Sequence, residues 1–183
     1  GIDELRQSLS HPIVCQVFPM PISSSMFRLW DRREILLGNI YDRLPQTFGH
    51  LDPGHHNLFS RRNSVGVDET VAIDWELAGI GALGEELVRL VTNSLFFRLF
   101  PIDKAQELDE VAFTGYIDGL RDAGWQGDPR QVRYGYVAVS ITRALRLARL
   151  VRVFQDEDRY HAWLGKKVNG SFEEMIASCR KLM

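Results

Sequence analysis

A single interruption in an otherwise helical pattern constrains this sequence most. Apolar residues recur at helical spacing over residues 23–44 and again through most of the chain after residue 83. Between Thr47 and Trp75 the spacing changes to two short apolar runs, residues 57–59 and 70–75, on either side of a polar stretch. Short apolar runs separated by turn residues are typical of a β-hairpin, whereas long periodic segments are typical of amphipathic helices. We therefore predict a mainly α fold with one small embedded β-hairpin.

Local signals set the expected limits of the helices that follow the hairpin. Asp128 and Pro129 suit the N-cap and first turn of a long helix that reaches about Phe154. Ser171 and Glu174 have the spacing of a capping box, which would start the last helix. Further helices are expected over residues 83–97, over residues 103–123 and from about residue 156. We find no internal repeat and expect residues 1–183 to form a single domain.

Composition argues against several kinds of partner. The chain is 45% hydrophobic and 25% charged, which is typical of a globular protein, and its formal net charge of −2 gives no electrostatic reason to bind nucleic acid or a membrane. The apolar stretch at residues 12–22 is too short and too broken by prolines to span a bilayer. Cys15 and Cys179 lie far apart, which favours a reducing compartment. We expect a cytoplasmic protein without nucleic acid or membrane as partner.

Three polar side chains are expected to meet at the base of the predicted hairpin. Asp52 precedes the first strand, Asn57 opens it, and Asp74 ends the second strand. Two oxygen ligands, Asn57 and Asp74, suit Mg²⁺ when nucleotide phosphates complete its octahedron. The remaining carboxylate, Asp52, could then orient or deprotonate an attacking hydroxyl. Phosphoryl transfer needs these parts, because the protein mainly positions the reactants and neutralises charge.

The same segment resembles a known family of kinases. His50-x-Asp52-x-x-x-x-Asn57, followed by Ile-Asp-Trp-Glu at residues 73–76, is similar to the catalytic loop and metal-binding strand of aminoglycoside phosphotransferases and choline kinases. It also parallels the corresponding motifs of protein kinases. The resemblance implies that Asp52 is the catalytic base, that Asn57 and Asp74 bind Mg²⁺, and that His50 supports the loop through hydrogen bonds. It further implies the helical C-terminal lobe of a protein-kinase-like fold, with ATP or GTP as co-substrate.

The close resemblance covers about residues 47–90 and departs from the family at three points. Leu51 stands where the family commonly has glycine, the insert before Asn57 reads Pro-Gly-His-His, and Glu86 replaces the usual aspartate. None of these changes removes a charged group that the chemistry requires. They place the chain in a divergent branch of the family.

The residues that would hold nucleotide phosphates are not found upstream of the motif. A kinase of this type needs a Gly-rich loop and a lysine on a neighbouring strand. The first lysine of the chain is Lys104, and the only glycines before His50 are Gly1, Gly38 and Gly49. We therefore expect that the N-terminal, nucleotide-binding lobe is missing from residues 1–183, and that the chain is inactive without it.

Several functions are compatible with these patterns. The favoured one is an ATP- or GTP-dependent phosphotransferase acting on a hydroxyl of a small molecule, such as an aminoglycoside, another amino sugar or an amino alcohol. A second is a non-catalytic helical binding module derived from the same lobe. A third is a metal-dependent hydrolase that uses His50, His55 and His56, because imidazole and carboxylate groups suit zinc. Asp52, Asn57 and Asp74 could also be ordinary turn residues.

Two further patterns have alternative interpretations. Arginines recur every third residue on the long helix, either as a basic stripe for an anionic substrate or as a solvated face paired with acids. They are Arg143, Arg146, Arg149 and Arg152. The apolar residues of segment 13–22 either complete the helical core or form an exposed patch, through which the chain would self-associate as a possible homodimer.

Overall fold

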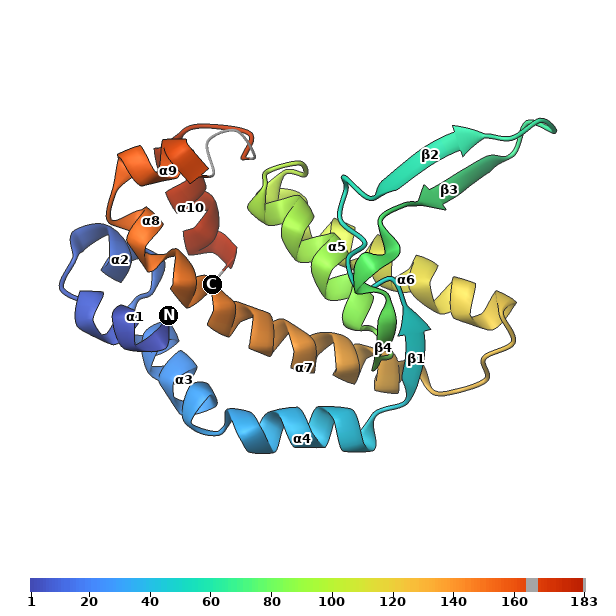
Figure 1. Cartoon of the computed structure of the whole chain (residues 1–183), viewed down its shortest axis with the longest axis horizontal. Helices are drawn as coiled ribbons and strands as arrows, with labels where there is room; N and C mark the ends of the chain where they lie inside the picture. Colours follow the sequence, from blue (N-terminus) through green and yellow to red (C-terminus); the bar gives the residue numbers. More distant parts are fainter. Residues whose placement is uncertain (164–167, 183) are drawn as a thin grey trace. The chain divides into compact units, whose positions relative to one another are not determined.

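The computed structural model describes residues 1–163 and 168–182, and for residues 39–41, 144, 146 and 182 it describes the backbone alone. The described chain is mostly helical and contains two small two-stranded antiparallel sheets (Figure 1). It divides into two compact units. Unit 1 comprises Gly1–Gly38, Leu95–Ala105 and Ser140–Met183, and unit 2 comprises Asn39–Ser94 and Gln106–Val139. None of the described helices combines the length and apolar character needed to cross a membrane. That the chain forms a single domain stays a prediction.

The elements follow one another along the chain in a simple order. The α-helices are α1 (Ile2–Ser8), α2 (Pro12–Val17), α3 (Met20–Asp31), α4 (Arg33–Arg43), α5 (Glu85–Phe96), α6 (Ala105–Asp122), α7 (Pro129–Leu147), α8 (Val151–Phe154), α9 (Glu157–Trp163) and α10 (Phe172–Leu182). The strands are β1 (Gln46–Gly49), β2 (Leu58–Arg62), β3 (Asp68–Ala72) and β4 (Gly79–Ala82). Short 3₁₀ turns, η1 (Trp75–Leu77), η2 (Ile102–Lys104) and η3 (Ala148–Leu150), connect some of them.

Most predicted helices are present, but two are interrupted. The helix predicted over residues 23–44 is two helices, α3 and α4, which meet at Arg32, where the backbone leaves the helical region (φ −104°, ψ 8°). The long helix predicted to reach Phe154 ends earlier, and η3 separates α7 from α8. Helices α1 and α2 were not predicted, because helices of seven and six residues contain too few repeats of the helical period.

The predicted helix starts are confirmed by their hydrogen bonds. The amide of Arg130 donates to Asp128 Oδ1 at 2.9 Å at the start of α7. At the start of α10 the amide of Glu174 donates to Ser171 Oγ at 3.3 Å, and the amide of Ser171 donates to Glu174 Oε2 at 2.8 Å. These reciprocal bonds form a capping box, which satisfies donors that the helix itself leaves unpaired.

The apolar segment near the N-terminus belongs to the core of unit 1. Val14, Val17 and Phe18 are fully buried, and the ring of Phe18 lies 5.9 Å from that of Phe154. Of the apolar residues in this segment, Met20 is exposed, with 71% of its surface accessible. The interpretation that the segment completes the core is confirmed, and the exposed patch proposed as the alternative is wrong. A homodimer stays a prediction without this patch to explain it.

The arginines of the basic stripe are divided between two kinds of environment. Arg152, in α8, pairs with Glu4 of α1, while Arg149 is exposed. Arg143 also takes part in a polar or electrostatic interaction. The side chain of Arg146 lies outside the described residues. Pairing with acids is thus observed at Arg152, as expected for a solvated helix face.

The two cysteines should differ sharply in reactivity. Cys15 is exposed, whereas burial within unit 1 raises the pKa of the Cys179 thiol to about 12. Because the thiolate is the reactive form, we expect a thiol reagent such as Ellman's reagent to modify Cys15 at pH 8 and to reach Cys179 only after unfolding. A Cys15→Ser variant that still reacts rapidly in its native state would show that α10 is not packed as described.

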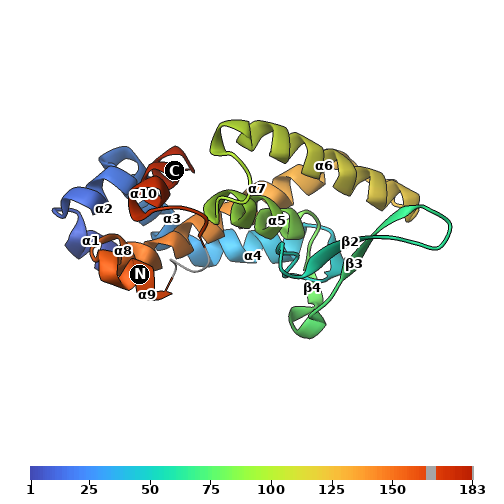
Figure 2. The same cartoon turned by 90° about the horizontal axis from the view of Figure 1, so that it is seen from above.

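In unit 2 the predicted hairpin is present, together with a second strand pair that was not predicted. Strands β2 and β3 form the hairpin, with Leu58 opposite Ala72, and it projects beyond the helices of this unit (Figure 2). Strands β1 and β4 pair with Gly49 opposite Gly79. Both strands have only four residues, and two of the four residues of β4 are glycines, so the sequence gives little indication of them. Their pairing brings the end of β1, just before His50, beside the segment that follows Asp74.

A close approach of two backbones fixes the start of α5 within unit 2. Gly84, between β4 and α5, has a φ of +89°, and a Cβ atom there would lie 2.4 Å from the carbonyl oxygen of Val132. A Cβ atom at Gly135 would lie 2.1 Å from the carbonyl oxygen of Leu83. The two glycines therefore let the β4–α5 turn lie directly on the first part of α7. This contact sets the place of the α5 residues that reach the candidate site.

Candidate functional site

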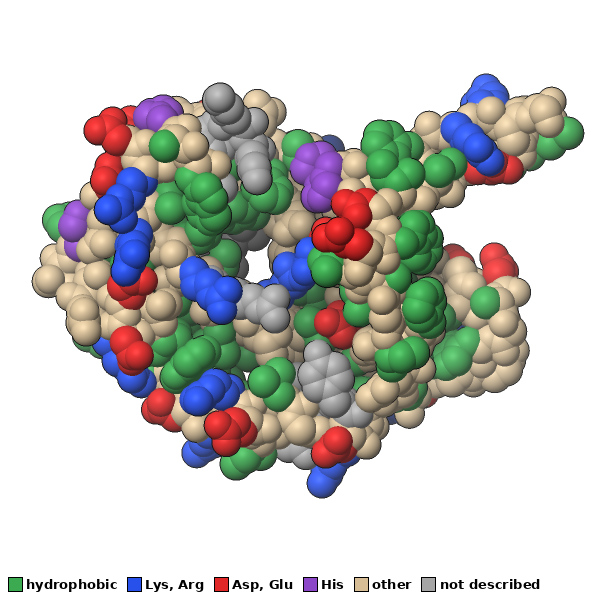
Figure 3. All heavy atoms as spheres, in the orientation of Figure 1, with side chains coloured by type: hydrophobic (Ala, Val, Ile, Leu, Met, Phe, Trp, Pro, Cys, Tyr) green, Lys and Arg blue, Asp and Glu red, His purple; other side chains and the backbone are tan. Residues whose placement is uncertain are grey.

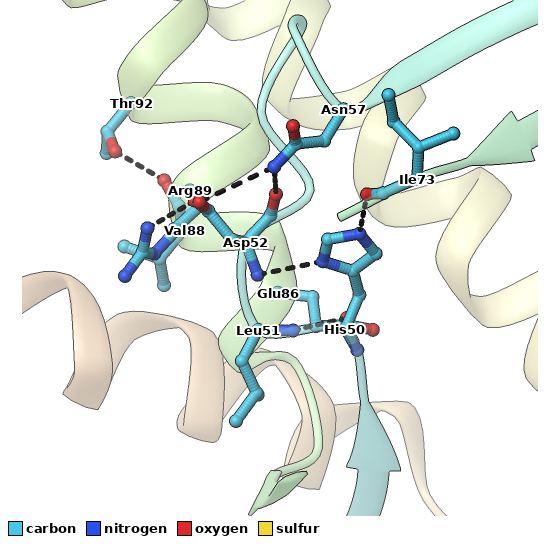
Figure 4. Close-up of polar contacts among 9 residues, drawn as sticks. All are labelled: His50, Leu51, Asp52, Asn57, Ile73, Glu86, Val88, Arg89 and Thr92. Carbon is cyan, nitrogen blue, oxygen red and sulfur yellow. Dashed lines mark hydrogen bonds and ion pairs between the residues drawn. The ribbon is translucent and has the colours of Figure 1, made fainter. Parts of the chain in front are cut away.

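His50 joins the loop after β1 to the segment after β3. Its side chain is buried, with 5% of its surface exposed, and its Nε2 lies 2.7 Å from the carbonyl oxygen of Ile73 (Figure 4). The amide of Asp52 donates to His50 Nδ1 at 3.3 Å. Because Nδ1 accepts, the ring hydrogen belongs on Nε2, which donates to Ile73. The ring of Trp75 lies 4.7 Å away from the ring of His50.

Asn57 binds directly to Asp52. Its Nδ2 donates to the backbone oxygen of Asp52 at 3.0 Å and lies 3.5 Å from Asp52 Oδ2. Asn57 is buried, and its amide oxygen points away from Asp52 (Figure 4). The backbone oxygen of Asn57 accepts from the amide of Ile73 at 3.0 Å. Asp52 and Asn57, two of the three residues predicted to meet, are therefore in contact. The third, Asp74, directly follows Ile73, which is hydrogen-bonded to both Asn57 and His50.

Asp74 occupies a left-handed backbone conformation at the start of η1. Its φ is 61° and its ψ is 65°, values that aspartate tolerates better than most residues. The expectation that Asp74 ends the second strand is wrong, because β3 ends at Ala72 and the chain turns away to form η1. The side chain is exposed, and among the described residues no hydrogen bond or ion pair engages its carboxylate. A metal position shared with Asn57 stays a prediction.

Glu86 on α5 binds the backbone of the same loop. Its Oε1 accepts hydrogen bonds from the amides of His50 at 2.6 Å and Leu51 at 3.1 Å. Room for this carboxylate comes from Gly49, where a Cβ atom would lie 2.9 Å from Glu86 Cδ. Glu86 therefore has a defined task in this chain: it holds the loop that carries Asp52.

Leu51 has an unusual backbone conformation that Glu86 helps to hold. Its φ is 58°, in the left-handed region that costs a non-glycine residue about 1–2 kcal/mol. The side chain packs on β4, where a Cβ atom at Gly81 would lie 2.8 Å from Leu51 Cδ2 and one at Gly79 would lie 3.6 Å from Leu51 Cδ1. Glycine is the residue best suited to this φ. Leu51 is accommodated because β4 presents glycines to it.

Arg89 is a site residue that was not predicted from the sequence. It lies three residues after Glu86 on α5 and forms an ion pair with Asp52 Oδ1 (Figure 4). The two side chains are largely enclosed, with 25% of Arg89 and 19% of Asp52 exposed. Residues spaced by three lie on the same face of a helix, so the Glu86–Arg89 spacing was a signal that both side chains reach the same loop.

The donor atoms fit magnesium better than zinc. Asn57 and Asp74 offer amide and carboxylate oxygens, the ligands that Mg²⁺ prefers. His50 uses both ring nitrogens in hydrogen bonds, whereas His55 and His56 are exposed. Within residues 1–163 and 168–182 no group of three His, Cys, Asp or Glu side chains is placed to hold a metal ion. The three histidines therefore do not form the metal cluster that the hydrolase interpretation requires.

Removing the Glu86 carboxylate should destabilise unit 2 markedly. In Glu86→Ala the amides of His50 and Leu51 lose their acceptor, and we expect a loss of about 2–3 kcal/mol in the free energy of unfolding. Asp118→Ala on the exposed face of α6 is the matched control, with an expected change within about 0.5 kcal/mol. Urea unfolding of both variants measures the difference. Equal stabilities would mean that these two hydrogen bonds do not hold the loop.

Comparison with known proteins adds no relative: no protein-family model matches the chain, and neither do curated proteins or solved structures.

Proposed function

We propose that this chain is the catalytic, acceptor-binding lobe of a small-molecule phosphotransferase and has the C-terminal-lobe part of a protein-kinase-like fold. The observation that carries the proposal is the connected loop at the base of the hairpin. There Asn57 binds Asp52, while His50 and Asn57 both bind Ile73, the residue before Asp74. A carboxylate base, an amide oxygen and a second carboxylate in this order are the protein groups that phosphoryl transfer uses.

In the proposed reaction Asp52 accepts the proton of an acceptor hydroxyl. The hydroxyl oxygen forms a bond to the terminal phosphorus of ATP or GTP, and the bond from that phosphorus to the bridging oxygen breaks, releasing the nucleoside diphosphate. Asn57 and Asp74 would hold Mg²⁺, which neutralises phosphate charge when bound. The His50 side chain binds the backbone oxygen of Ile73, and the Glu86 carboxylate binds the backbone amide of His50. These bonds fix the loop before substrate binds, which lowers the entropic cost of aligning the reactants. Candidate acceptors are aminoglycosides, other amino sugars and amino alcohols.

We propose that the nucleotide-binding part is supplied from outside residues 1–183. The described segment before β1 consists of helices, and no lysine precedes Asp52. In unit 2 several apolar side chains are exposed on β1, on β4 and on the segment between β3 and β4, and exposed hydrophobic side chains are visible in Figure 3. They are Phe48, Ile73, Trp75, Leu77 and Ile80, and Phe48 lies opposite Ile80 across the β1–β4 pair. Apolar surface of this kind is suited to contact with a base or with another folded part. The two unpaired cysteines support a reducing location such as the cytoplasm.

Binding of nucleotide to residues 1–183 alone should be weak. Capture of the phosphates would depend on Mg²⁺ and the side chains of Asn57 and Asp74, without the lysine and covering loop that other kinases use. We expect calorimetric titration of Mg²⁺-ATP into the purified chain to give little or no heat of binding. Micromolar affinity would show that the chain already holds a complete nucleotide site.

The function is tested by phosphoryl transfer from γ-labelled ATP and GTP to a panel of hydroxyl compounds. The enzyme should be the native gene product, with any nucleotide-binding part that accompanies it. We expect labelled product with the wild type and loss of at least about a hundredfold in Asp52→Asn, since a general base contributes about 10²–10⁴-fold. Asp118→Asn on α6 should retain the wild-type rate. Absence of transfer to every acceptor, with small-molecule binding intact, would favour the non-catalytic binding module.

A further inference from the structure

The ion pair between Arg89 and Asp52 joins α5 to the side chain of the proposed base. Glu86 and Arg89, one turn apart on α5, divide the loop between them: Glu86 binds its main chain, and Arg89 binds the Asp52 carboxylate. The start of α5 is itself fixed by the close contact of Gly84 with α7. Within the described residues, Arg89 thus reaches from α5 to the Asp52 carboxylate.

The Asp52 carboxylate is held from two sides. Its Oδ1 faces the Arg89 guanidinium, and its Oδ2 lies 3.5 Å from Asn57 Nδ2 (Figure 4). A carboxylate bonded at one oxygen only can still rotate about its Cβ–Cγ bond, whereas one held at both oxygens keeps a single orientation. Each oxygen has a second lone pair, so Oδ2 retains acceptor capacity for a hydroxyl.

The guanidinium also balances charge at the site. Asp74, Glu85 and Glu86 are acidic, and a bound nucleotide would add the negative charge of its phosphates. Arg89 is the cation in contact with Asp52 among the described residues. Its Nε is buried and makes no hydrogen bond within the described part of the chain, so the guanidinium is engaged through the pair with Asp52.

We infer that Arg89 is a positioning residue that orients the Asp52 carboxylate for the phosphoryl transfer proposed above. The inference rests on the proposed role of Asp52, but the geometry it describes exists without nucleotide or metal. Arginine suits this task better than lysine because its planar group forms directional bonds to a carboxylate.

The first test is nuclear magnetic resonance of the guanidinium groups in the full chain. A guanidinium held by a carboxylate rotates slowly, and we expect separate Nη signals for Arg89 in the wild type. Arg130 pairs with Asp128 at an exposed site, where the arginine side chain is 92% accessible, and should give averaged signals. Asp52→Asn should collapse the separate Arg89 signals into one. Averaged Arg89 signals in the wild type would overturn the inference.

The second test uses the signals of the positioned groups. In Arg89→Met we expect the carboxyl carbon signal of Asp52 and the side-chain amide signal of Asn57 to shift. In Arg89→Lys both signals should lie close to their wild-type positions. In the control Arg130→Met both signals should stay unchanged. Unshifted signals in a folded Arg89→Met protein would contradict the inference. If that variant does not fold, the wild-type measurement above decides. Neither test needs Mg²⁺ or nucleotide, so a protein that passes both yet transfers no phosphate keeps the positioning and loses only the proposed function.

Discussion

Gly84→Ala is expected to lower the free energy of unfolding of unit 2 by about 3 kcal/mol or more. Alanine at a φ of +89° costs about 1–2 kcal/mol, and its Cβ atom would lie 2.4 Å from the carbonyl oxygen of Val132. That neighbour is backbone in α7, so relief requires the helix to move, at an overpacking cost of about 1–3 kcal/mol. Urea unfolding followed by circular dichroism measures the loss, and hydrogen exchange of the α5 amides should show the same change locally.

The control for this variant is a glycine substitution with the opposite expected sign. Gly115 lies in α6, where nothing surrounds the place of an added Cβ atom. Gly115→Ala should stabilise unit 2 by about 0.5–1 kcal/mol, because alanine favours the helix. If Gly84→Ala were as stable as wild type while Gly115→Ala behaved as expected, the β4–α5 turn would not lie on α7, and the place of Glu86 and Arg89 would be wrong.

Phe18→Ala should produce the second large effect, in unit 1. The ring is fully buried beside Phe154, and truncation of a buried phenylalanine costs about 3–5 kcal/mol. Met20→Ala, two residues further on and exposed, should change the stability by less than about 0.5 kcal/mol. Thermal unfolding measures both variants, and light scattering reports their association. A Phe18→Ala protein that keeps its stability but loses self-association would restore the exposed patch in place of the core.

The hairpin and the main helices could be predicted because each depends on local signals. The change of period between residues 47 and 75 marked β2 and β3, and Asp128, Ser171 and Glu174 marked the helix starts. The interruptions within the long helices were not predicted. The helical spacing of apolar residues continues on both sides of Arg32 and of η3, and neither place has a proline or glycine that would signal the end of a helix. Such breaks follow from tertiary packing rather than from local preference.

The candidate site shows the same division. Asp52 and Asn57 lie five residues apart before the first hairpin strand, so their contact could be predicted from the sequence order. That Asp74 joins them stays a prediction. The β1–β4 pair, the left-handed Leu51 and the contacts of Arg89 depend on residues thirty or more positions away or on glycines that make room for them. Their sequence signals are weak because glycine and arginine occur in many other structural contexts, so that one such residue does not indicate a particular contact.

The central claim is that Asn57 and Asp74 bind a magnesium ion beside Asp52. Paramagnetic broadening by Mn²⁺, which substitutes for Mg²⁺ at oxygen sites, tests it most directly in the purified chain. We predict that low Mn²⁺ concentrations first broaden the signals of residues 73–75 and the side-chain amide of Asn57, that excess Mg²⁺ reverses the broadening, and that Asp74→Asn abolishes it. The Asp74 carboxylate makes no hydrogen bond or ion pair within the described chain, so this variant should remain folded. Broadening that starts at other acidic residues and is unchanged in Asp74→Asn would contradict the claim.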